Sequence, residues 1–110
     1  MSNEDALHIE VSFKDLNRTD AIDTHAREAA EKQLGRFSSR LTRLEIHIAD
    51  ENAKKSGPDD KRVLIEARPK GGDPQVVESH GSDLYKTIDD AASKMHRLLE
   101  RHFDKQDQRR

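Results

Sequence analysis

The sequence contains no cysteine, which excludes a disulfide framework, a zinc site built on thiolates and a cysteine nucleophile. It also lacks a run of about 18 apolar residues that would cross a bilayer. The first ten residues have neither the basic nor the apolar region of a signal peptide. We therefore expect a cytoplasmic protein with no membrane segment.

Apolar residues are few, at 32% of the chain against 38% charged residues. This composition approaches those that bury too little apolar surface to offset the conformational entropy of the chain. The length of 110 residues fits one domain with one core. We expect a single domain, residues 1–110, with a thin core over about 7–103 and a flexible tail over 104–110.

Two segments have the alternating or helical spacing that marks the first half of the fold. Residues 7–13 alternate between apolar and polar, which predicts a strand with one buried face. Thr19 or Asp20 offers a side-chain oxygen for a helix start, and apolar residues then recur at helical spacing as far as Phe37. This helix is expected to end between Gly35 and Ser38.

The second half predicts three strands and a long helix. Residues 44–48 and 63–67 alternate, Pro69 ends the third strand, and residues 75–80 return as a fourth. A long turn-rich connection, 50–61, separates the second and third strands. Ser82 or Asp83 caps a helix whose apolar positions continue to Phe103. The order β-α-β-β-β-α predicts an α+β fold, a four-stranded mixed sheet with both helices packed on one face.

Charge is segregated although the net charge is only −2. On the second helix, five cations fall within a stripe about 100° wide that only Asp90 interrupts. We call this stripe the basic edge: Lys86, Lys94, Arg97, Arg101 and Lys105. Carboxylates on its other side form the acidic edge: Asp89, Glu100, Asp104 and Asp107.

The first helix has a basic flank of its own, made of His25, Lys32 and Arg36 and leading to Arg40 and Arg43. If the helices pack side by side, we expect the two basic flanks to form one groove that binds successive phosphates. The alternative is that these charges are only a solvated face. Tyr85 has two interpretations, stacking on a base or covering the edge of the core.

No pattern typical of a metal or catalytic site is present. None of the six histidines forms an HxxxH pair, and the acidic residues of 50–61 do not have the calcium-loop spacing. There is no glycine-rich phosphate loop and no nucleophile elbow. We expect a protein that is not an enzyme and has no metal, cofactor or small-molecule substrate.

Two segments of the second helix, DLYKTID at 83–89 and KMHRLL at 94–99, resemble the second-helix motif of ribosome hibernation promoting factors. Residues 19–22 and 34–37 are similar to that family's first helix. The resemblance covers about 7–103 and suggests a short-type, single-domain factor. Asp90 and the long 50–61 connection depart from the family pattern.

The resemblance implies that the domain binds small-subunit rRNA near the decoding region. It would block the mRNA and tRNA path during stress or stationary phase, and inhibit translation by occlusion. Family contacts carry over to Lys32 and Arg36 on the first helix and to Lys86, Lys94, Arg97 and Arg101 on the second, and the charge pattern adds Arg40. An alternative is a regulatory domain that binds a protein through the acidic edge or the 50–61 loop. A metal-dependent hydrolase using the loop carboxylates has little support.

Overall fold

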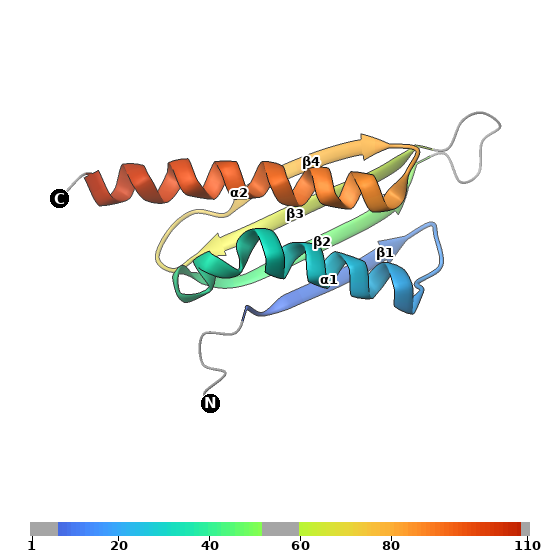
Figure 1. Cartoon of the computed structure of the whole chain (residues 1–110), viewed down its shortest axis with the longest axis horizontal. Helices are drawn as coiled ribbons and strands as arrows, with labels where there is room; N and C mark the ends of the chain where they lie inside the picture. Colours follow the sequence, from blue (N-terminus) through green and yellow to red (C-terminus); the bar gives the residue numbers. More distant parts are fainter. Residues whose placement is uncertain (1–6, 52–59, 109–110) are drawn as a thin grey trace.

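The computed structural model describes residues 7–51 and 60–108, and the predicted order of elements is confirmed (Figure 1). Residues 52–59 of the predicted 50–61 connection lie outside the described residues. A short 3₁₀ helix, η1, follows the first helix. The elements are β1 (Ile9–Lys14), α1 (Asp20–Leu34), η1 (Gly35–Arg40), β2 (Leu41–Asp50), β3 (Lys61–Pro69), β4 (Gln75–Gly81) and α2 (Leu84–Gln108).

The strands form one mixed sheet in the order β1-β2-β3-β4. The β1–β2 pair is parallel, and the β2–β3 and β3–β4 pairs are antiparallel. A parallel pair needs a crossover connection, which α1 supplies between β1 and β2. Both helices lie side by side over the same face of the sheet (Figure 1), so the predicted α+β architecture is correct.

The core lies between this face of the sheet and the helices. Alternation places Leu44, Ile46 and Ile48 of β2 on the helical side, where all three are buried. Met95 and Leu99 of α2 are fully buried above the sheet. The opposite face of the sheet has no helix over it in the described structure. Its charged side chains pair along a strand, as Arg43 does with Glu45, and across strands, as Arg68 does with Glu45.

The helix ends follow the predicted capping chemistry. Thr19 Oγ1 accepts a hydrogen bond from the backbone N–H of Ile22 at 3.1 Å, and Asp83 Oδ1 accepts from that of Lys86 at 3.3 Å. Of the predicted flexible tail, 104–110, residues 104–108 belong to α2, which continues to Gln108, and residues 109–110 lie outside the described residues. Arg40 of η1 pairs with Asp107, and this contact joins the last turns of α2 to the rest of the molecule.

Cationic side chains cover backbone carbonyls of both edge strands. The carbonyl of His8 accepts from Leu44 N–H, so the carbonyls of Ile9 and Val11 face the open side of β1. Arg27 donates to the carbonyl of Ile9 at 2.9 Å and Arg18 to that of Val11 at 2.6 Å. Lys94 donates to the carbonyl of Glu78 on β4 at 2.8 Å. Such contacts oppose the addition of another strand to the sheet.

Within the described ranges, no helix has the length and apolar character needed to cross a membrane. The longest helix, α2, is amphipathic, with one buried stripe and a charged solvent face.

Candidate nucleic-acid interface

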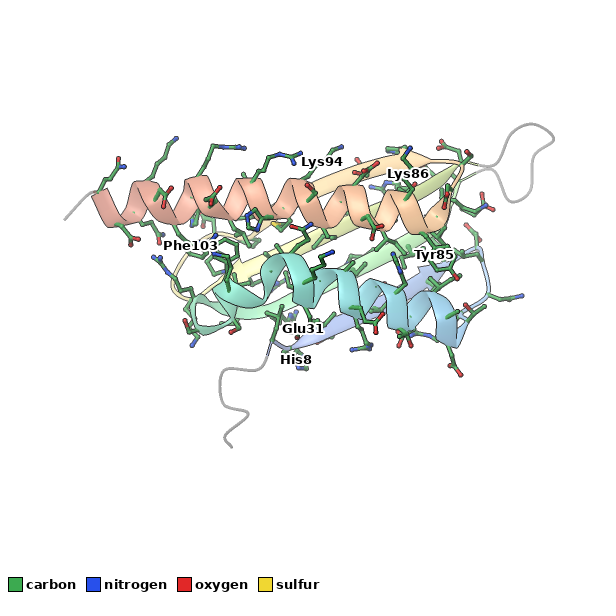
Figure 2. The ribbon with its side chains drawn as sticks, viewed as in Figure 1. His8, Glu31, Tyr85, Lys86, Lys94 and Phe103 are labelled. Carbon is green, nitrogen blue, oxygen red and sulfur yellow. The ribbon has the colours of Figure 1, made fainter. Side chains whose placement is uncertain are left out.

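The basic edge lies on the side of α2 that faces away from α1. Figure 2 shows Lys86 and Lys94 pointing away from α1, whereas Tyr85 lies on the α1 side of the same helix. All five residues of the edge are exposed. Because an α-helix rises 1.5 Å per residue, Lys86 and Lys105 are separated by about 28 Å along the axis. The edge is therefore a long cationic ridge and not a closed pocket.

Three cations of the ridge are free to bind a ligand. The side chains of Lys86, Arg101 and Lys105 have no hydrogen-bond or ion-pair partner among residues 7–51 and 60–108. Lys94 reaches the β4 backbone, and Arg97 donates to Ser93 Oγ on its own helix at 2.8 Å. Neither of these two contacts neutralises the charge of its cation with a carboxylate.

The cations of α1 and η1 do not join this ridge, contrary to the expectation that two basic flanks meet. Arg36 lies 3.5 Å from Glu100, and His25 Nε2 lies 2.8 Å from Asp89 Oδ1. The flank of α2 that packs beside α1 is thus the acidic edge. Helical spacing gives the angle between two side chains on one helix but not the direction of the neighbouring helix, which explains the wrong expectation.

Arg40 is the most firmly held of the predicted contact residues. Its two terminal nitrogens donate to the two carboxylate oxygens of Asp107 at 3.3 and 3.1 Å, a bidentate fork. The guanidinium carbon also lies 4.1 Å from the centre of the Phe103 ring. Arg40 therefore joins η1 to the end of α2.

A groove of about 390 Å³ lies between α1 and α2. His25, Glu28 and Lys32 line it from α1, and Asp89 lines it from α2. The His25 ring meets Tyr85 edge-on with centroids 4.9 Å apart, so Tyr85 packs against α1 although 44% of it is exposed. Since the lining has both signs of charge, this groove does not supply the cationic phosphate channel that the sequence predicts.

Three possible metal ligands meet at the other end of the sheet. Glu51, Asp60 and His80 each place one ligand atom within 4.8 Å of the others. The sequence pattern indicates the loop carboxylates as possible ligands but not His80, which the pairing of β3 with β4 brings beside them. The Glu51 and His80 side chains are exposed and lie 3.3 Å apart, and exposed groups of this kind commonly lie together without a bound ion. Nearby, a hydrogen bond from Arg62 is the main cause that holds the pKa of Glu78 below its ordinary value of 4.5.

Comparison with known proteins identifies the family. The sequence profile described as "Sigma 54 modulation protein / S30EA ribosomal protein" matches residues 9–107. The chain belongs to this family of ribosome-associated factors. The resemblance drawn from the two helix motifs is therefore confirmed.

Two solved structures have the same fold as this family member. The N-terminal domain of Protein Y from Thermus thermophilus is 21% identical, with a TM-score of 0.72 over 87% of this chain and 99% of that one. A ribosomal subunit interface protein from Coxiella burnetii is 20% identical, with a TM-score of 0.69 over 89% of this chain and 99% of that one. No curated protein matches the sequence at a significant level.

Proposed function

We propose that this family member binds small-subunit rRNA near the decoding region and inhibits translation by blocking the mRNA and tRNA path during stress or stationary phase. The observation that carries the proposal is the basic edge, where exposed cations follow one side of α2 and have no carboxylate partner in the described part of the chain. Membership of a ribosome-associated family supports a ribosomal partner. The Coxiella burnetii protein of the same fold is described as a ribosomal subunit interface protein, which agrees with such a partner. A cytoplasmic location follows from this function.

The mechanism is occlusion, which needs positioning and charge but no chemical step, cofactor or small molecule. Phosphates attract cations without regard to base sequence and fix the orientation of a bound protein. Lys86, Arg97 and Arg101 are the first contacts in this proposal, with Lys94 beside them. Lys32 contributes from the groove between the helices. Arg36 and Arg40 contribute only when their carboxylate partners are displaced.

Co-sedimentation with purified small ribosomal subunits tests the proposal. Arg101→Glu should weaken binding by at least about tenfold, because a carboxylate would then face phosphate within the ridge. Its melting temperature should change little, since exposed substitutions alter stability by only about 0.5 kcal/mol. Binding of the unaltered protein should also fall more than about tenfold between 50 and 200 mM salt, as several phosphates are neutralised.

Lys14→Glu is the matched control, because it makes the same charge change at an exposed lysine on β1, far along the sheet from α2. We expect it to alter affinity by less than about twofold at moderate salt, where charges beyond about 10 Å are screened. Equal losses for the two variants would mean that net charge matters and the ridge does not. An affinity for small subunits that does not change with salt concentration would contradict binding through phosphate contacts.

The alternative function, a protein-binding regulator that uses the acidic edge, gains no specific support. Glu100 and Asp107 each pair with an arginine of the same molecule, and Asp89 contacts the His25 ring. Most of the 50–61 loop lies outside the described residues. The acidic edge thus has an internal role, which leads to the next inference.

A further inference from the structure

Two residues of the acidic edge of α2 pair with arginines of η1. Glu100 binds Arg36 at 3.5 Å, and Asp107 binds Arg40 through the bidentate fork at 3.3 and 3.1 Å. The Arg36, Glu100 and Asp107 side chains are roughly half exposed, and that of Arg40 is 39% exposed. These contacts are therefore accessible from solvent and can exchange with an external anion.

The partners are also chemically suited to exchange. A phosphate offers the same pair of oxygens to a guanidinium fork as a carboxylate does. Other acidic residues of the helices have no such role: Glu28, Glu31 and Asp104 are exposed and have no cationic partner among the described residues. Among these acidic residues, only Glu100 and Asp107 pair with the η1 arginines Arg36 and Arg40.

We propose that Glu100 and Asp107 compete within the molecule with RNA phosphate for Arg36 and Arg40. In the free protein the two carboxylates occupy these arginines, so neither guanidinium adds to the cations that the basic edge offers to an external phosphate. RNA that spans both helices displaces the carboxylates and gains two further phosphate contacts. RNA that reaches only the basic edge does not. The competition raises selectivity for an extended RNA surface over simple polyanions, and it rests on the proposed RNA-binding function.

The direct test is the double variant Glu100→Gln/Asp107→Asn, which keeps the shape of both side chains and removes their charge. Two probes are needed: purified small ribosomal subunits, and an unrelated 20-base-pair RNA duplex followed by fluorescence anisotropy. Exposed ion pairs are individually weak, so we expect the variant to bind the duplex about three- to tenfold more tightly. The salt dependence should steepen by about two phosphates, a change of roughly 1.8 in the slope of log affinity against log salt.

The control Glu28→Gln/Glu31→Gln removes the same two charges from exposed positions on α1. It should change duplex affinity by less than about twofold and leave the salt slope unaltered. An equal gain in both variants would show that the effect is one of net charge and would overturn the proposal.

A mutant cycle then isolates the coupling between partners. In the Arg36→Gln background, Glu100→Gln should give no gain in duplex affinity, because there is no arginine left to release. A full gain in that background contradicts the competition. This cycle uses the looser of the two pairs and leaves the Arg40–Asp107 contact in place, and a thermal melt of each variant confirms folding.

The two probes separate this inference from the proposed function. If the double variant binds the duplex more tightly but neither protein binds small subunits, the result would support the competition and reject the ribosomal function. If the unaltered protein binds subunits strongly and the double variant binds neither probe more tightly, the result would support the ribosomal function and reject the competition.

Discussion

A single glycine at the end of β4 leaves room for the start of α2. A Cβ at Gly81 would lie 2.7 Å from Thr87 Oγ1, closer than van der Waals contact allows. Thr87 cannot easily move, because it is 2% exposed and its hydroxyl donates to the carbonyl of Asp83 at 2.7 Å. The backbone turn into α2 therefore depends on a residue without a side chain.

Gly81→Ala should lower the free energy of unfolding by about 1–3 kcal/mol, the usual cost of overpacking. Urea denaturation of the purified variant measures this loss. Gly72→Ala is the matched control, since its Cβ would meet nothing nearer than 3.5 Å and should have a much smaller effect. Similar losses for the two variants would contradict the steric explanation.

Arg40 shows how one residue can satisfy two interpretations of the same charge pattern. The sequence places it in a run of cations suited to phosphate, and the structure places it on Phe103 and Asp107. A local charge pattern contains no information about a partner 67 residues away. Binding of rRNA by Arg40 therefore stays a prediction, whereas its contacts with Phe103 and Asp107 are seen in the structure.

At the level of elements, α2 contributes most of the apolar surface that covers β3 and β4. Met95 is fully buried at the middle of this helix, between the helical layer and the sheet. Met95→Ala should lower the free energy of unfolding by about 2–4 kcal/mol. The transfer free energy of the removed atoms is lost, and the cavity left behind adds a further cost. A protein of this size has little stability in reserve, so the loss should be plain in a thermal melt.

Asp90→Ala provides the comparison for Met95→Ala, since Asp90 lies on the solvent face of the same helix without a partner in the described residues. We expect its melting temperature to stay close to that of the unaltered protein. If Met95→Ala also left the melting temperature unchanged, α2 would not be docked on the sheet through its apolar stripe.

The elements could be predicted because their signals are local. Leu44, Ile46 and Ile48 alternate as a half-buried strand must, and Thr19 carries the oxygen that a helix start requires. The sequence gives no signal for the end of α2, whose last turns contact Arg40, a residue far away in the sequence. Apolar periodicity ends at Phe103 and gives no indication of this contact.

The candidate site could be predicted only in part, because spacing along one helix is a local signal and the packing of a second helix beside it is not. The basic edge of α2 follows from spacing alone, but the identity of the flank beside α1 does not. A usable signal was present in Tyr85 and His96, two partly apolar side chains on the acidic side of the helix. His96 Nδ1 lies 2.7 Å from the carbonyl of Gln33, and Tyr85 packs on His25. Their positions identify the flank that meets α1.

On the scale of the whole molecule, two arginines from outside β1 cover its open edge. Arg18 and Arg27 occupy carbonyls that would otherwise pair with a further strand. The substitution Arg18→Ala/Arg27→Ala should therefore promote association through β1. Because Lys94 still covers β4, we expect dimers and not long polymers.

Sedimentation velocity over a range of protein concentrations measures this association. Lys32→Ala/Lys86→Ala removes the same charge from side chains that make no hydrogen bond to an edge strand in the described ranges, and it should remain monomeric. Dimers in both variants would indicate that lower charge repulsion is the cause. A melt of the arginine variant is needed as well, because Arg18 and Arg27 also pair with Asp23.

The parallel pairing of β1 with β2 has a consequence for how the chain is made. Phe13 is paired with Ile48, so β1 leaves the synthesising ribosome 35 residues before its partner. At about 5–20 residues per second, this is a wait on the order of 2–7 s with the strand unpaired. The helix that carries the basic edge follows all four strands in the chain. A nascent chain therefore cannot present the complete cationic ridge until every strand of the sheet has been translated.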